Sequence, residues 1–170
     1  MATSFLLKNQ PLAQVLRDLK SRHKEIDLGA VESYRALMML ANRLRDAADL
    51  FLADFGTSQG KASVLVHLSG QAQASLTPSE LAQRLGVTRA TVTGLIDGLE
   101  REGLVRRVRA GSADRRCVAV RLAPKGRALV ERFLPPHCRR IGSVMAGLSA
   151  SERATLVKLL DKIAASVASL

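Results

Sequence analysis

Aromatic residues are scarce in this sequence: tryptophan is absent, and aromatic residues make up only 3% of the 170 residues. The hydrophobic share is still 47%, so the core must be built from leucine, valine, alanine, isoleucine and methionine. Leucine, alanine and methionine favour helices, whereas strands favour aromatic and β-branched residues. The composition therefore predicts a mainly helical protein, and the length suits one domain with helical extensions.

Cysteines and long apolar runs are also scarce. The two cysteines, Cys117 and Cys138, are too few for a disulfide framework, and we expect a structural role for both. No run approaches the roughly 18 apolar residues of a membrane span. The first residues lack the basic start of an export signal. We therefore expect a cytoplasmic protein that does not act at membranes.

Sequence signatures of catalysis are missing as well. His67 and His137 have no partners at metal-ligand spacing. We find no paired carboxylates, no Ser/His/Asp set and no phosphate-binding loop. The sequence thus predicts no metal, no cofactor and no enzymatic activity.

Positive charge, in contrast, is abundant and unevenly placed within a net charge of +11. Residues 1–75 hold nine Lys and Arg against seven Asp and Glu, a balance of +2. Residues 101–127 hold nine against two, a balance of +7. Such clustering favours a polyanionic partner at one site over general solubility. This segment is therefore predicted to bind nucleic acid.

The spacing of apolar residues predicts helices at residues 5–20, 31–55 and 58–69. Another helix starts at Pro124, and the pair Pro135 and Pro136 must interrupt or kink it. Ser149 or Ser151 is expected to cap the last helix.

Residues 77–101 carry the signals of two short helices joined by a tight turn. Thr77 is an N-cap residue, and Pro78 and Glu80 suit the first turn that follows it. Gly86 supplies the backbone freedom that a tight turn needs, and Thr88 can cap the second helix. The pattern predicts a helix-turn-helix, in which the second helix enters the DNA major groove.

The outward face of that second helix is expected to read DNA. Arg89 can form two hydrogen bonds to the edge of a guanine. Such a contact typically contributes about 1–3 kcal/mol of discrimination against other bases. We expect Asp97 to pair with Arg101, one helical turn on. Gly94 and Gly98 each cost about 1 kcal/mol relative to alanine in a helix, and close approach to DNA is one reason to keep them.

A basic hairpin follows. Residues 105–108 and 117–122 alternate like half-buried strands around a polar turn, and Leu76 can add a short strand. Arginines at the tip suit insertion into a narrow minor groove. Asp114 is expected to orient one of them, or to serve as a plain turn residue. The predicted DNA contacts are Thr77, Ser79, Thr88, Arg89, Ala90, Thr91, Thr93, Arg109, Arg115 and Arg116.

Residues 32–170 resemble the MarR family of transcriptional regulators, which have a winged helix-turn-helix core. The Asp-x-Arg pattern of the family's wing matches Asp114 and Arg116, and its Leu-Thr-x-x-Gly pattern matches residues 122–126. Ala123 replaces the threonine of that pattern, which removes a helix cap worth about 1 kcal/mol. Gly94 and Ala62 stand where many members carry arginine and an aromatic residue.

The resemblance implies an obligate homodimer on a pseudo-palindromic operator in double-stranded DNA, with Arg116 in the minor groove. It divides the chain into an N-terminal helical extension (1–30), a helical dimerisation region (31–57 and 123–170) and a DNA-binding lobe (58–122). The expected fold is mainly α with a small β-wing. The predicted dimer contacts are Leu12, Leu16, Leu19, Leu156, Leu159, Leu160 and Ile163.

Members of this family are commonly released from DNA by small aromatic acids or phenols, or by cysteine oxidation. The resemblance implies a ligand cavity near Met38, Arg45, Ala62 and Val66. It predicts a nucleoid-associated repressor that such a ligand releases. Three alternatives stay open: a sequence-indifferent DNA-architectural protein, a thiol-based redox-responsive regulator and a protein-binding winged helix.

Overall fold

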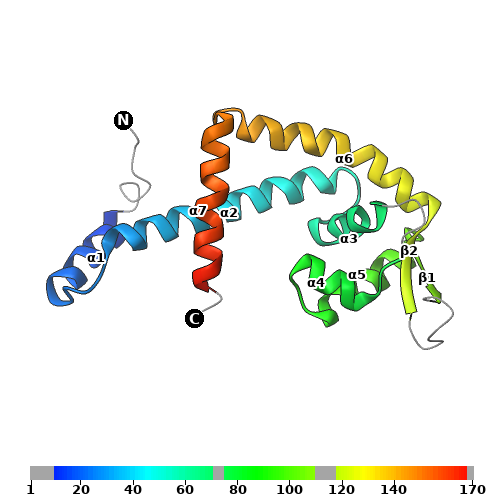
Figure 1. Cartoon of the computed structure of the whole chain (residues 1–170), viewed down its shortest axis with the longest axis horizontal. Helices are drawn as coiled ribbons and strands as arrows, with labels where there is room; N and C mark the ends of the chain where they lie inside the picture. Colours follow the sequence, from blue (N-terminus) through cyan, green and yellow to red (C-terminus); the bar gives the residue numbers. More distant parts are fainter. Residues whose placement is uncertain (1–9, 71–74, 110–117, 168–170) are drawn as a thin grey trace. The chain divides into compact units, whose positions relative to one another are not determined.

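The computed structural model describes residues 10–70, 75–109 and 118–167 (Figure 1). The chain divides into two compact units, Met1–Phe51 and Leu52–Leu170. This boundary falls inside a helix, and the assignment of a dimerisation region stays a prediction. The elements are α1 (Gln10–Arg22), α2 (Leu28–Ala53), α3 (Gln59–Ser69), α4 (Pro78–Leu85), α5 (Arg89–Arg101), β1 (Val105–Arg109), β2 (Val118–Leu122), α6 (Pro124–Met145) and α7 (Ala150–Val167).

The first unit contains α1 and most of α2. The Asp27 carboxylate accepts hydrogen bonds from the N–H groups of Gly29 (2.9 Å) and Ala30 (3.1 Å). An acidic side chain in this place satisfies free amide groups and complements the helix dipole. The helix therefore begins at Leu28, and the predicted start at residue 31 is wrong by about one turn.

The second unit is built around one apolar core, which is mostly aliphatic. Its fully buried side chains include Leu65 of α3, Leu81 of α4, Ile96 of α5 and Phe133 of α6. Figure 1 shows α3, α4 and α5 gathered beside the two strands. Phe55 and Phe133 meet edge to face, with ring centroids 6.3 Å apart, so the few aromatic residues are used together.

The strands form an antiparallel ribbon. Val105 pairs with Leu122, and Arg109 pairs with Val118. Where an extra short strand was predicted, Leu76 forms a single β-bridge to the ribbon: its N–H donates to the Val120 carbonyl (3.0 Å), and the Val120 N–H donates to the Leu76 carbonyl (2.8 Å). The mainly α fold with a small β-wing is thereby confirmed.

Helix α6 does not stop at its two prolines. Pro135 and Pro136 both lie inside it, so of the two predicted effects the interruption is wrong, whereas the kink stays a prediction. Proline has no N–H to donate to a backbone hydrogen bond of the helix. The energy of side-chain packing can nevertheless outweigh the hydrogen bonds that are lost at the two prolines. Here Val130 and Phe133 are buried in the core just before the pair.

Helix α7 has a capping box but no buried face. Ser149, one of the two predicted caps, accepts a hydrogen bond from the Glu152 N–H (3.3 Å), and the Glu152 carboxylate accepts from the Ser149 N–H (2.7 Å). None of residues 150–167 is buried in the single chain. Over the described part of the chain, no helix is both long and apolar enough to cross a membrane.

Helix α6 begins without a side-chain cap, as its alanine predicts. Ala123 is the N-cap residue and makes no side-chain bond, although its N–H donates to the Leu104 carbonyl (3.0 Å). Gly126 lies against the same carbonyl: a Cβ placed there would be 2.0 Å from the Leu104 oxygen. The glycine of the predicted family pattern is therefore required by close backbone packing.

Gly126→Ala should destabilise the protein, because the backbone of α6 would have to move away from Leu104. We expect a loss of about 1–3 kcal/mol in the free energy of unfolding. Gly94→Ala is the matched control, since a Cβ at Gly94 meets no atom within 4 Å. It should stabilise α5 by about 1 kcal/mol. Urea unfolding measures both, and equal effects of the two variants would contradict the packing argument.

Candidate nucleic-acid interface

The first helix of the helix-turn-helix starts from a complete capping box. The Thr77 hydroxyl accepts a hydrogen bond from the Glu80 N–H (3.2 Å). The Glu80 carboxylate accepts from the Thr77 N–H (2.7 Å) and from the Thr77 hydroxyl (2.8 Å). The backbone hydrogen bond from Thr77, followed by the hydroxyl bond, lowers the pKa of Glu80. The predicted cap at Thr77 is confirmed. The Glu80 carboxylate completes the capping box and so fixes the residue at which α4 begins.

The turn between the two helices depends on Gly86. Its φ of 65° lies in the left-handed region, which glycine adopts without a steric penalty. The Val87 N–H returns to the Ala82 carbonyl (3.1 Å), which closes the end of α4. This turn sets the direction of α5 relative to α4. The prediction from the sequence that Gly86 makes the turn is confirmed.

Helix α5 buries one face and exposes the other. Val92 and Ile96 are fully buried, whereas Arg89 and Ala90 are exposed. Thr88 caps the helix by accepting from the Thr91 N–H (3.1 Å). Small side chains surround an exposed arginine at the start of this helix, which is the shape that a major-groove helix needs.

The predicted hydroxyl contacts are partly engaged within the protein. The Thr88 and Thr91 hydroxyls hydrogen-bond to each other (2.9 Å), and the Thr93 hydroxyl donates to the Arg89 carbonyl (2.9 Å). Ser79 is exposed in the first turn of α4. A hydroxyl that donates locally still has an oxygen lone pair but no proton for a phosphate. As a donor to DNA, Ser79 is thus better placed than Thr93.

An arginine of β1 holds the ribbon against α5. Arg107 pairs with Asp97 (2.5 Å) and with Glu100, whose carboxylate also accepts from the Arg107 N–H (3.2 Å). The hydrogen bond to Asp97 is the main cause that raises the pKa of Arg107. The predicted pairing of Asp97 with Arg101 is therefore wrong: Arg101 bonds only the Asp97 backbone carbonyl (3.3 Å).

Gly98 has a packing role that the sequence did not reveal. A Cβ there would lie 3.3 Å from the Lys61 Cε, so the glycine leaves a channel for that side chain. Lys61 crosses α5 to pair with Glu102 at the end of the helix. Gly94, in contrast, faces open space on the exposed side. Close approach to DNA can therefore explain why position 94 is a glycine. Gly98, in contrast, makes room for the contact between α3 and α5.

The base of the wing is visible, but its tip lies outside the described residues. Arg106 and Arg109 are exposed on β1. Asp114, Arg115, Arg116 and Cys117 belong to the segment that the structure does not describe, so their predicted roles stay predictions. Cys138 is a free thiol exposed on α6 in the single chain, and the structural role expected for it stays a prediction.

Two of the four predicted ligand-contact residues line one cavity. Ala62 and Val66 border a space of about 200 Å³ together with Phe133 and Leu134 of α6. Met38 and Arg45 lie in the first unit, and their predicted place beside the ligand stays a prediction. Sequence reasoning missed the polar residues that do line it: Gln59, Ser63, His67 and His137. The spacing of Ser63 and His67, one helical turn apart beside Ala62 and Val66, was a usable signal.

Glu80→Gln keeps the capping geometry but removes the charge. A carboxylate whose pKa is lowered by folding stabilises the fold above its ordinary pKa, and this contribution disappears as the pH falls through the lowered value. The variant should therefore unfold more easily than the wild type at neutral pH, with a difference that shrinks in acid. Urea unfolding from pH 7 to pH 3 measures this. Glu131→Gln, an exposed carboxylate within α6, is the control; a Glu80→Gln effect that stays constant with pH would contradict the prediction.

Three comparisons agree with this geometry. The sequence profile of the MarR family matches residues 55–116. The HTH-type transcriptional repressor YetL of Bacillus subtilis is 35% identical over 157 residues, which cover 92% of this chain and 93% of the repressor. A MepR–DNA complex of S. aureus aligns with a TM-score of 0.71 and 26% identity, over 78% of this chain and 94% of that one.

A fourth match is a complex with a ligand. The PcaV transcriptional regulator of Streptomyces coelicolor, solved with its natural ligand, aligns with a TM-score of 0.62 and 26% identity, over 75% of this chain and 91% of that one. The fold, the capped helix-turn-helix and the repressor that matches nearly the full length lead to one conclusion. The chain belongs to the MarR family and is a DNA-binding transcriptional regulator with a winged helix-turn-helix, not an enzyme.

Proposed function

We propose that this protein is a homodimeric, sequence-specific repressor that binds a pseudo-palindromic operator. The observation that carries the proposal is the exposed face of α5, where Arg89 stands among small side chains beside the basic strand β1. A protein that bound only phosphates would gain nothing from such a face, since phosphate contacts hold no sequence information. A regulator of this kind acts on the chromosome, at the nucleoid in the cytoplasm.

In this proposal α5 lies in the major groove. Arg89 bonds a guanine edge, Ala90 packs on a neighbouring base, and Ser79 donates its hydroxyl to the DNA backbone from the start of α4. Thr77 lies beside it, but its hydroxyl proton is given to Glu80. The wing reaches the adjacent minor groove with Arg109, Arg115 and Arg116. Among the described residues, no carboxylate lies within 4 Å of Arg89 or Arg109, so both are available to DNA.

The homodimer explains apolar side chains that the single chain leaves exposed. On α7, Leu159 is 51% exposed and Ile163 is 46% exposed. Leu160 is exposed and Leu156 half-buried on the same helix, while Leu16 and Leu19 are half-buried on α1. Covering such residues in a two-fold interface would stabilise the dimer by about 25 cal/mol for each Å² of apolar surface. Two-fold symmetry would place the half-sites about one helical turn of DNA apart.

The proposed effector is a small aromatic acid or phenol that binds near Ala62 and Val66. The cavity there combines apolar walls with the side chains of Gln59, Ser63 and His67, which can hydrogen-bond a hydroxyl or carboxylate. The ligand-bound PcaV relative supports the general mode of regulation. The effector would release DNA by favouring a conformation that fits the operator poorly.

Arg89→Ala should relax sequence preference, whereas Arg116→Ala should weaken binding to all sequences. Fluorescence anisotropy with DNA from upstream of the protein's own gene, and with a scrambled duplex, measures both at two salt concentrations. We expect the wild type to prefer its own upstream DNA, and Arg89→Ala to lose about 1–3 kcal/mol of that preference. Equal, steeply salt-dependent binding of the wild type to the two duplexes would contradict the proposal and favour an architectural protein.

Arg107 and Arg109 provide a matched pair on one strand. Arg109→Gln should flatten the dependence of log K on log salt by about 0.9 for each phosphate that the protein no longer neutralises. Arg107→Gln removes an arginine that is already paired with Asp97 and Glu100, so the salt slope should stay nearly unchanged. The anisotropy titrations, run from low to high salt, compare the two slopes. A flatter slope for Arg107→Gln alone would show that the assignment of these two arginines is reversed.

A further inference from the structure

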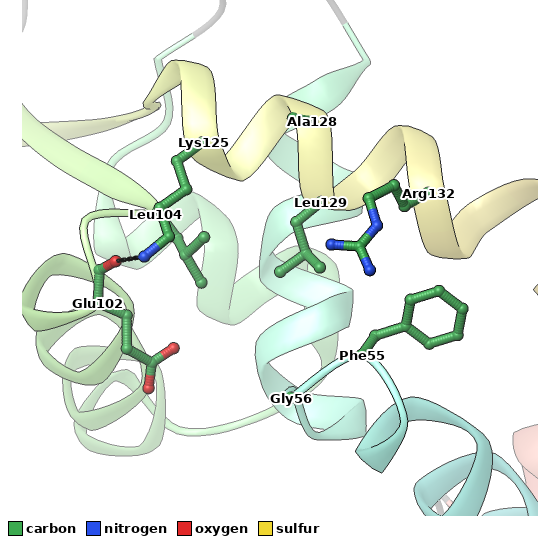
Figure 2. Close-up of a pocket in the computed structure, with 8 residues that line it drawn as sticks. All are labelled: Phe55, Gly56, Glu102, Leu104, Lys125, Ala128, Leu129 and Arg132. Atoms are coloured by element: carbon green, nitrogen blue, oxygen red, sulfur yellow. Dashed lines mark hydrogen bonds between the residues drawn. The ribbon is translucent and has the colours of Figure 1, made fainter.

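A second, larger pocket lies on another part of the same unit. It has a volume of about 370 Å³ and is bordered by the end of α5, the start of β1, the first turns of α6 and the segment before α3. Figure 2 shows its lining, with the side chains of Lys125, Leu129 and Arg132 descending from α6 toward Phe55 and Glu102. Its size falls within the range of small-molecule sites, about 300–1,000 Å³.

The charges in this pocket are unbalanced. Glu102 is paired with Lys61, so its carboxylate is already neutralised. Lys125 donates to the Glu102 backbone carbonyl (2.9 Å) but has no carboxylate partner within 4 Å among the described residues. The same is true of Arg132 in this part of the chain. Two cations therefore border one pocket with no anion to balance them.

The arginine is also backed by an aromatic wall. The guanidinium carbon of Arg132 lies 6.0 Å from the centroid of the Phe55 ring. Leu104, Ala128 and Leu129 supply the other apolar surfaces. A guanidinium held over a ring keeps its planar edge free, and that edge can bond both oxygens of a carboxylate.

We propose that this pocket binds a small organic acid, with its carboxylate on Arg132 and its apolar body against Phe55 and Leu129. Lys125 lies two helical turns from Arg132 on the same face of α6, about 10 Å along the axis, and can hold a polar group at the far end of the ligand. The site is separate from the cavity at Ala62 and Val66, because the two share no lining residue.

Isothermal titration of the purified full chain, without DNA, tests this inference. The probes are 2-naphthoate, the uncharged 2-naphthylmethanol and inorganic phosphate. We expect saturable binding of 2-naphthoate and at least about tenfold weaker binding of each other probe, because one lacks the charge and the other lacks the apolar body. Phosphate binding as tight as that of the acid would overturn the assignment to an organic acid.

Substitutions then locate the site. Arg132→Gln should weaken 2-naphthoate binding at least about tenfold, and Arg132→Lys should weaken it less, since it keeps the charge but not the planar edge. Arg139→Gln is the matched control, an exposed arginine two turns further along α6 that lines no part of this pocket. Thermal unfolding checks that each variant is folded.

Val66→Phe separates this pocket from the cavity near Ala62. The substitution fills that cavity and should leave 2-naphthoate binding at Arg132 unchanged. Because the effector proposed for that cavity is also an aromatic acid, Arg132→Gln is compared within the Val66→Phe protein. Two results would overturn the inference: no saturable binding of 2-naphthoate by Val66→Phe, or undiminished binding when Arg132→Gln is added to it. Because the titration contains no DNA, its outcome is independent of the proposed operator binding.

Discussion

The Leu104 carbonyl holds the second unit together at the point where α5, the ribbon and α6 meet. It accepts the Ala123 N–H (3.0 Å), and Gly126 packs so closely against it that no side chain fits between them. The Leu104 N–H in turn donates to the Leu99 carbonyl in α5 (2.9 Å). The start of the ribbon and the start of α6 are therefore fixed to the end of α5. Strand β1 starts beside this carbonyl and β2 ends beside it, so the orientation of the base of the ribbon relative to α5 is fixed.

Ion pairs around α5 divide the basic residues into two classes. Lys61 and Arg107 bind carboxylates on α5 or at its end, whereas Arg89 and Arg109 stay exposed. Partly exposed pairs add little stability, typically about 0–1 kcal/mol each. Their effect is to fix the orientation of α5 relative to α3 and β1. The net charge of the 101–127 segment thus overstates the charge that is available to DNA.

Helix α6 contributes to both cavities described above. Its first turns supply Lys125 and Arg132 to the larger pocket, and its later turns supply Phe133 and His137 to the smaller one. Because Gly126 ties the same helix to the base of the ribbon, a movement of α6 would reach the wing directly. The proposed ligands of the two cavities would thus contact the same helix, and that helix is joined to the base of the ribbon.

Local signals in the sequence determined the helix-turn-helix and its caps. Thr77, Gly86 and Thr88 act through bonds to residues within five positions, so their roles could be inferred without tertiary structure. The sequence also determined the mainly helical fold, since an aliphatic core with few aromatic residues packs as helices. Only the tertiary structure decided that Asp97 pairs with Arg107, that Gly98 makes room for Lys61, and that α6 continues through two prolines. These features depend on contacts between elements, and the energy of packing there exceeds the local preferences that a sequence reveals.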